Sequence, residues 1–172
     1  MMLLKDENEF QEWVMARFAA AGGHVCDHRN SATVAVPDLS AALRGIDYWL
    51  ELKHGGNFKL LHNGRRYQRF ELRETQRRQV DWLQLRAMAG NCVCGILAYF
   101  TVSGDHTLDG EEQPYIFFMN TDDYLNRLVR GEMDAGAVVL SRFSTHFDKV
   151  KTCRDLTAFI RSAGGAERVR QR

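Results

Sequence analysis

The chain has 172 residues, of which 45% are hydrophobic and 26% charged, and its formal net charge is +1. These values predict one soluble domain with a full hydrophobic core. No run of about 18 apolar residues is present and the N-terminal apolar run is short, so we expect neither a membrane-spanning helix nor a signal peptide, and a cytoplasmic protein. The four cysteines lack the paired spacing of a zinc site, so we expect reduced and mostly buried thiols.

Hydrophobic periodicity and turn signals predict helices that alternate with strands along the chain. The expected helices are residues 6–21, 73–90, 121–131 and 156–163.

The expected strands are separated by turn-forming residues, among them Arg44-Gly45, and by a long connection that would turn at Asn63-Gly64. They are residues 24–29, 32–39, 46–53, 92–102, 114–120 and 137–143.

The order of these elements predicts a three-layer α/β/α domain with a central mixed β-sheet. The first three strands are close enough in sequence to form an antiparallel meander, and the helix before the fourth strand predicts a crossover connection. We expect a single domain, 1–172, with a core at 7–100, a basic insertion at 55–71 and a C-terminal extension at 136–172.

The stretch "VPDLSAALRGIDYWLELKHGG", residues 36–56, places charged residues at the ends of two expected strands. Side chains alternate along a strand, so Glu51 and Lys53 share one face. Asp38 follows Pro37 at the end of the strand before it. The pattern predicts that two carboxylates and one ammonium converge at one point.

Two ionised carboxylates that lie close together repel each other, and a hard divalent cation removes that repulsion. Mg²⁺ binds through one or two carboxylates together with waters and substrate phosphate oxygens. Lys53 beside such a site would bind phosphate, orient an attacking water or stabilise charge on the phosphorus. The residues therefore favour metal-assisted phosphodiester hydrolysis, and the alternative is a surface ion pair of Glu51 and Lys53 with Asp38 as a turn residue.

The segments "VPDL" and "YWLELK" resemble the motif of the PD-(D/E)xK nuclease superfamily, which shares the restriction-endonuclease-like fold. Within it, the chain is most similar to the virus-type replication-repair nucleases (VRR-NUC) and the archaeal-type Holliday junction resolvases. The resemblance spans roughly residues 7–100. Its elements are Glu7, Gly22-Gly23, Pro37-Asp38, Glu51-Leu52-Lys53, Leu72, Thr75-Gln76, Gly90 and the apolar strand "CVCGILAYF".

The resemblance implies that Asp38 and Glu51 ligate Mg²⁺, or Mn²⁺ in its place, with the Leu52 carbonyl as a third protein ligand. Lys53 would be the catalytic lysine, and Gln76 would face the site and place either the phosphate or Lys53. No organic cofactor is implied. DNA would be the partner, and a homodimer is left open because the sequence defines no interface.

Helix phase selects which N-terminal acid belongs to the site. Glu7 lies three residues before Phe10 and seven before Val14, which places it on the buried face of its helix. Glu9 and Glu12 are rotated away from it by roughly 200° and 140°, so both should be solvated. Glu7 is therefore expected at the site, directly or through a metal-bound water, and the alternative is a partner for the helix dipole.

Three further polar residues lie near the expected site. Gln76 precedes Val80 by four residues and lies on the sheet-facing side of its helix, where its amide needs partners. An active site or a helix-start hydrogen bond would each supply them. His54 follows the motif lysine and His28 ends a strand, and for both a surface or structural role is favoured over phosphate contact or proton transfer.

A basic block runs from Lys53 to Arg78, with eight Lys or Arg against two acids, in a chain that is otherwise near neutral. Such a block indicates a face for a polyanion. Phe58, Tyr67 and Phe70 are interleaved with it and would either stack on exposed bases or pack inward as a hairpin. The predicted nucleic-acid contacts are Lys59, His62, Arg65, Arg66, Arg69, Arg73 and Arg77.

These features predict a Mg²⁺-dependent DNA endonuclease for branched, flap or Holliday junction DNA, acting in replication, recombination or repair in a bacterial or phage-infected cytoplasm. One alternative is a less selective nuclease for ends or single strands. The other is a non-cleaving DNA-binding or assembly protein, against which the converging carboxylates argue. The basic insertion, the acidic loop at 103–113 and the C-terminal extension leave the substrate preference open.

Overall fold

A computed structural model gives the fold of the chain. The residues it describes are 3–29, 35–59, 67–68, 74–103, 113–121, 138–139 and 144–163.

A six-stranded sheet forms the middle layer, in the order β1-β2-β3-β5-β6-β8. A separate two-stranded sheet pairs β4 with β7. The strands are β1 (His24–Asp27), β2 (Leu39–Leu43), β3 (Ile46–Lys59), β4 (Tyr67–Gln68), β5 (Cys92–Ser103), β6 (Gln113–Asn120), β7 (Val138–Val139) and β8 (Ser144–His146).

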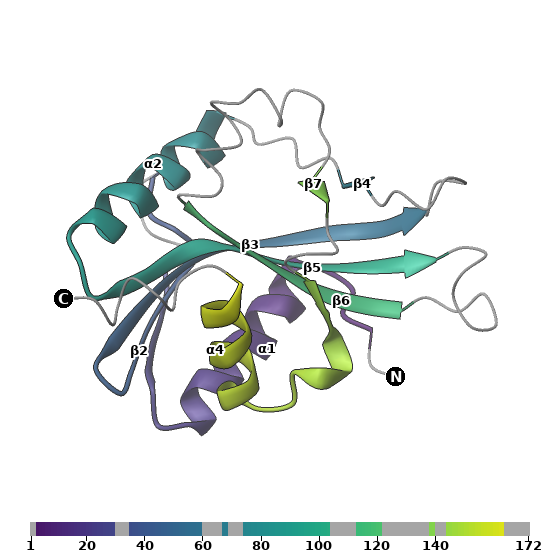
Figure 1. Ribbon diagram of the computed structural model, residues 1–172, viewed down its shortest axis with the longest axis horizontal. Helices are drawn as coiled ribbons and strands as arrows, with labels where there is room; N and C mark the ends of the chain where they lie inside the picture. The colour runs from purple at the N-terminus through teal and green to yellow at the C-terminus, as the bar shows by residue number, and fades with distance from the viewer. Residues whose placement is uncertain are drawn as a thin grey trace.

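Helices cover both faces of the main sheet (Figure 1). Helices α1 and α4 lie together on one face and α2 lies on the other, which makes a three-layer α/β/α arrangement. Among the described residues no helix is both long and apolar enough to cross a membrane. The helices are α1 (Glu7–Ala20), α2 (Glu74–Met88), the 3₁₀ helix η3 (Phe147–Lys149) and α4 (Cys153–Ser162).

The sheet is mixed, as the order of elements predicts. Strands β1, β2 and β3 form an antiparallel meander, and β3 then pairs in parallel with β5 through the crossover that contains α2. Strands β6 and β8 continue the sheet in antiparallel pairing. The expected architecture is confirmed, and it places the middle of β3 in the centre of the sheet.

The expected strand 32–39 is wrong in the part that the structure describes. Residues 35–38 form a turn, and β2 begins only at Leu39, directly after Asp38. Pro37 has no N–H to give to a strand ladder, which favours a turn here over a paired strand. Asp38 therefore introduces a strand, where the sequence pattern placed it at the end of one.

Strand β3 is longer than expected. It continues into the segment assigned to the basic connection, covers residues 55–59 of it and ends at Lys59, with a register shift against β5 between His54 and Asn57. The glycine pair in this gap is compatible with the irregularity, because glycine in a strand often marks a bulge. The hairpin turn predicted at Asn63-Gly64 lies outside the described residues.

The C-terminal part differs in detail from the expected elements. Of the expected strand 137–143 the structure describes residues 138 and 139, which form β7, and one edge of the main sheet is the unexpected strand β8. Helix α4 starts at Cys153, earlier than expected, because Thr152 and Asp155 form a capping box. The expected helix after Thr121, the acidic loop and the tail from residue 164 lie outside the described residues.

The hydrophobic core on one face of β3 holds the strand in place, and the charged motif lies on its other face. Tyr48, Leu50 and Leu52 are fully buried toward α1 and α4, as their alternation predicts. On β5, Gly95 lies opposite Leu50, and a Cβ there would lie 2.4 Å from the Met119 carbonyl oxygen. The absence of a side chain at this position allows β6 to pack closely against β5, the strand that pairs with β3.

Candidate active site

Asp38 lies beside β3, one residue before the start of β2. The β2–β3 pairing starts at Leu39, opposite Leu50, so the next residues of β3 have no β2 partner on that side. The Leu52 N–H instead donates to Asp38 Oδ2 at 2.8 Å. A residue's N–H and C=O point to the same edge of a strand, so the Leu52 carbonyl also points toward the edge where the Asp38 carboxylate lies.

Lys53 is the centre of a cluster with three carboxylates. Its Nζ lies 2.7 Å from Glu51 Oε1, 3.9 Å from Asp38 Oδ2 and 3.9 Å from Glu7 Oε2. The side chain of Glu51 is only 1% exposed, and those of Lys53 and Asp38 are each 15% exposed. The three motif residues and Glu7 thus come from a turn, one strand and the first turn of α1. We call these four side chains the carboxylate–lysine cluster.

Burial and like charges act strongly on Glu51. Burial, with a further contribution from the neighbouring carboxylates of Asp38 and Glu7, raises the pKa of Glu51 to about 8, although Lys53 opposes the shift. Its Oε2 is buried and has no hydrogen-bond donor among the described residues. Burial lowers the pKa of Lys53, but the carboxylates, Glu51 first, outweigh burial and hold its pKa above the ordinary value. The lysine therefore stays charged at neutral pH.

The chemistry of this cluster fits a hard divalent cation. Three carboxylates against one ammonium leave a surplus of negative charge when all are ionised, and a cation would relieve it. Glu51 Oε2, Asp38 and the Leu52 carbonyl are oxygen donors of the kind that Mg²⁺ takes, together with waters. Within the described ranges, no three His, Cys, Asp or Glu are grouped tightly enough to hold a metal by themselves. A cation here would therefore need water or substrate to complete a donor set of two carboxylates and a carbonyl.

Glu7 reaches the cluster without being buried. Its side chain is 45% exposed, although Glu7 lies on the face of α1 that carries the buried Phe10 and Val14, so it borders the cluster from the solvent side. Besides Lys53, Glu7 Oε2 accepts from the backbone N–H of His54 at 3.4 Å. Glu9 instead pairs with Lys5, and Glu12 is exposed. Among these three acids only Glu7 contacts the motif.

The remaining predicted residues fall outside the described side chains. The backbones of Gln76 and Arg77 belong to α2 and that of Lys59 to β3, but their side chains lie outside what the structure describes. The other predicted nucleic-acid contacts lie wholly outside the described residues. Their roles stay predictions. The residues concerned are Gln76, Lys59, His62, Arg65, Arg66, Arg69, Arg73 and Arg77.

Gln11 is a site-supporting residue that the sequence reasoning missed. It is fully buried on α1, and its Nε2 donates to the Asp38 backbone carbonyl at 3.4 Å. From α2, Gln79 donates to the carbonyl of Val36 at 3.4 Å, so both helices hold the turn that presents Asp38. Gln11 lies four residues after Glu7, so the helix phase that selects Glu7 also selects Gln11.

His54 and His28, the two histidines near the predicted site, have structural partners. His54 Nε2 lies 3.0 Å from the Leu4 carbonyl oxygen and its ring stacks on Tyr99, whose hydroxyl accepts from the Leu4 N–H. His28 Nε2 lies 2.8 Å from Ser40 Oγ, and its ring stacks on Trp49. His54 in particular ties the segment before α1 to β3, which helps to place Glu7.

Comparisons with known proteins give a likeness only among solved structures, where twelve chains match. No family model matches the chain, and none of the curated proteins does. Among solved structures, the chain is similar to Hjc, a Holliday junction resolvase from the archaeal hyperthermophile Archaeoglobus fulgidus, at 14% sequence identity and a TM-score of 0.37. The match covers 67% of this chain and 77% of that chain.

Proposed function

We propose that the protein is a Mg²⁺-dependent DNA endonuclease that hydrolyses phosphodiester bonds at the carboxylate–lysine cluster. The observation that carries the proposal is the position of Lys53, within 3.9 Å of Asp38, Glu51 and Glu7. A structural ion pair needs one carboxylate, and a DNA-binding surface gains nothing from a surplus of negative charge beside a phosphate. Such a surplus is useful where a cation and a phosphate are bound together.

Each residue has a definite part in this proposal. Asp38, Glu51 and the Leu52 carbonyl would hold the cation, which supplies charge neutralisation and activates water for attack on phosphorus. The Asp38 carboxylate is held in place by the Leu52 N–H. Lys53, charged and largely buried, would orient the attacking water or stabilise the charge that develops on the phosphate oxygens. Glu7 would act on the cation through a water or hold the Lys53 ammonium.

The class of substrate rests on the sequence motif. The residues that converge in space are those of the PD-(D/E)xK pattern, and the motif resembles that of nucleases for branched and recombining DNA. We infer a preference for branched, flap or four-way junction DNA in replication, recombination or repair. Symmetric paired cuts across a four-way junction would indicate a homodimer, because two cuts made together require two active sites.

A substrate panel tests this function. Wild-type protein and Glu51→Gln are incubated with labelled four-way junction, flap, single-stranded and linear duplex DNA, in Mg²⁺, in Mn²⁺ and in chelator. We expect cleavage of the branched substrates by the wild type in either metal, and none in chelator or by the variant. Binding of DNA by the wild type without cleavage of any substrate would contradict the enzyme and favour a non-cleaving DNA-binding protein.

A further inference from the structure

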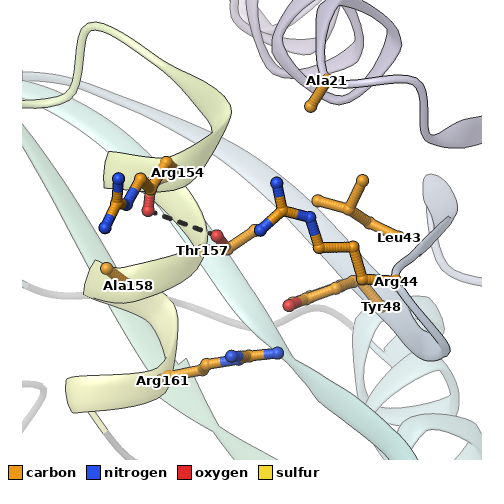
Figure 2. Close-up of a pocket in the computed structure, with 8 residues that line it drawn as sticks. All are labelled: Ala21, Leu43, Arg44, Tyr48, Arg154, Thr157, Ala158 and Arg161. Atoms are coloured by element: carbon orange, nitrogen blue, oxygen red, sulfur yellow. Dashed lines mark hydrogen bonds between the residues drawn. The ribbon is translucent and has the colours of Figure 1, made fainter.

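A cavity of about 260 Å³ lies on the α1–α4 face of the sheet, away from the carboxylate–lysine cluster. Its walls are the β2–β3 turn, the start of β3, the end of α1 and one side of α4 (Figure 2). Tyr48 in its wall lies five residues before Lys53, which is about 16 Å along a strand that rises about 3.3 Å per residue. Its side chain packs on Phe18 of α1, on the face opposite to Glu51. The cavity is therefore a separate site.

Positive charge gathers around this cavity. Three arginines line it, Arg44, Arg154 and Arg161, and no carboxylate is among its described lining residues. In the part of the chain that the structure describes, none of the three forms an ion pair. Figure 2 shows Arg44 reaching inward from the β2–β3 turn and Arg161 from α4, with the Tyr48 hydroxyl between them in this view. Guanidinium groups that gather around a hollow without an ion-pair partner favour an anion.

Tyr48 adds a directed hydrogen-bond donor. Tyr48 is only 1% exposed, and burial raises the pKa of its hydroxyl even though the charge of Arg161 and a hydrogen bond from it lower the pKa. The hydroxyl therefore stays protonated at neutral pH. A guanidinium can only donate, so the Tyr48 oxygen accepts from Arg161 and its O–H remains to donate. No acceptor for that O–H is found within the described ranges.

Arg44 occupies a backbone position that ordinarily takes another residue type. Its φ is 52° and that of Gly45 is 76°, so both residues of this two-residue hairpin turn lie in the left-handed region. Such turns strongly favour Asn or Asp before Gly, and a long side chain at positive φ is uncommon. Residues in sparsely populated backbone conformations cluster at functional sites, which supports a role for the Arg44 side chain.

We propose that this cavity binds a phosphate group through the guanidinium groups of Arg44 and Arg161 and the hydroxyl of Tyr48. The planar fork of a guanidinium matches two oxygens of a phosphate, and Arg is the residue that recognises this group most specifically. The cavity is smaller than the roughly 300 Å³ at which sites for whole drug-sized ligands begin. It therefore holds one phosphate group, from either a DNA backbone or a small phosphomonoester.

The variant Arg44→Asn tests the site without endangering the fold. Asn before Gly suits this turn better than Arg, so the variant should be at least as stable as the wild type. Lys151→Asn is the matched control, since it removes one exposed positive charge just before α4 and outside the cavity. Inorganic phosphate is titrated calorimetrically at constant ionic strength in chelator, because the metal-free carboxylate–lysine cluster repels anions.

We expect one saturable phosphate site in the wild type and in Lys151→Asn, and an affinity at least about tenfold weaker in Arg44→Asn. Equal affinities in all three proteins, or no saturable binding by the wild type, would overturn the proposal. Competition then identifies the source of the phosphate group. Displacement by a short single-stranded oligonucleotide assigns it to a DNA backbone, and displacement by ribose 5-phosphate alone assigns it to a small molecule. Displacement by neither would also overturn the proposal.

Discussion

At the scale of single residues, the site depends on one lysine that is outnumbered by carboxylates. Lys53 keeps its charge because Glu51, Asp38 and Glu7 surround it, and deep burial raises the pKa of Glu51. In the metal-free protein a proton on Glu51 offsets part of the negative charge. A divalent cation would take over that part, since it favours the ionised carboxylate.

The pKa of Glu51 makes the stability of the metal-free protein depend on pH. Its folded value of about 8 lies above the ordinary value of 4.5, so between the two the folded protein binds more protons than the unfolded chain. The free energy of unfolding should therefore fall as the pH rises through this window. Urea denaturation in chelator measures it at several pH values. Glu51→Gln, which does not titrate, should show a flatter dependence, and identical slopes for the two proteins would contradict the assigned pKa.

At the scale of elements, the site is built where a strand edge lies open beyond its hairpin partner. Because β2 starts only after Asp38, the Leu52 N–H is free to bind the Asp38 carboxylate. Helix α1 holds the backbone of the same turn through Gln11, and α2 holds it through Gln79. The turn between residues 35 and 38 is thus fixed from three elements, which preorganises the Asp38 carboxylate.

Gln11 is expected to be a positioning residue for Asp38. Gln11→Ala removes one of two donors to the Asp38 carbonyl, the other being the His28 N–H, and loss of such a supporting contact weakens metal binding by about 10–100-fold. Cleavage rates are measured across a Mg²⁺ titration. We expect the half-saturating Mg²⁺ concentration to rise and excess Mg²⁺ to restore most of the rate. Glu12→Ala, an exposed neighbour on α1, should leave the titration unchanged. A lower rate at every Mg²⁺ concentration, with no change in half-saturation, would contradict this role.

Gly95 is expected to be required for the closure of β6 on β5. In Gly95→Ala the new methyl would lie within 2.7 Å of the Met119 carbonyl and the Phe118 ring, so the strands must separate. We expect a loss of about 1–3 kcal/mol in the free energy of unfolding, measured by urea denaturation. Ala42→Gly, at an exposed position of β2, changes one methyl without crowding and should cost less than about 1 kcal/mol. Equal stability of Gly95→Ala and wild type would show that the contact relaxes freely.

Strand alternation in the sequence predicts the faces of β3 correctly, because a period of two leaves no freedom once one face is buried. It does not predict where β2 begins, since the turn at 35–38 depends on hydrogen bonds from Gln11 and Gln79 on distant helices. Helix phase indicates the contact of Glu7 with Lys53 but not the exposed fraction of the Glu7 side chain, because phase gives the direction of a side chain and not what covers it. The roles of Gln76 and of the basic block stay predictions.

At the scale of the whole molecule, β3 contributes to two regions of opposite charge. Glu51 and Lys53 lie on one face of the strand, and the arginine-lined cavity lies between Tyr48 on the opposite face and helices α1 and α4. The first would bind a cation and the second a phosphate group. A chain with a net charge of only +1 can thus present both kinds of surface.

Cation binding at the cluster should stabilise the whole fold. A ligand that binds only the folded state adds about 2.7 kcal/mol at a hundredfold excess over its Kd. Thermal unfolding in increasing MgCl₂, against NaCl of equal ionic strength, measures the effect. We expect Tm to rise for the wild type and for Glu12→Gln but not for Glu51→Gln. A rise of equal size in all three proteins would mean that Mg²⁺ acts elsewhere on the molecule.

The central claim is that the carboxylate–lysine cluster cleaves DNA, and single-turnover cleavage of a labelled flap or junction in Mg²⁺ tests it most directly. Lys53→Met keeps most of the aliphatic volume but removes the ammonium, and Glu12→Gln is the matched control on exposed surface. We predict a rate roughly 10²–10³-fold lower for Lys53→Met, with folding checked by circular dichroism, and no change for Glu12→Gln. Equal rates for Lys53→Met and wild type would contradict the account.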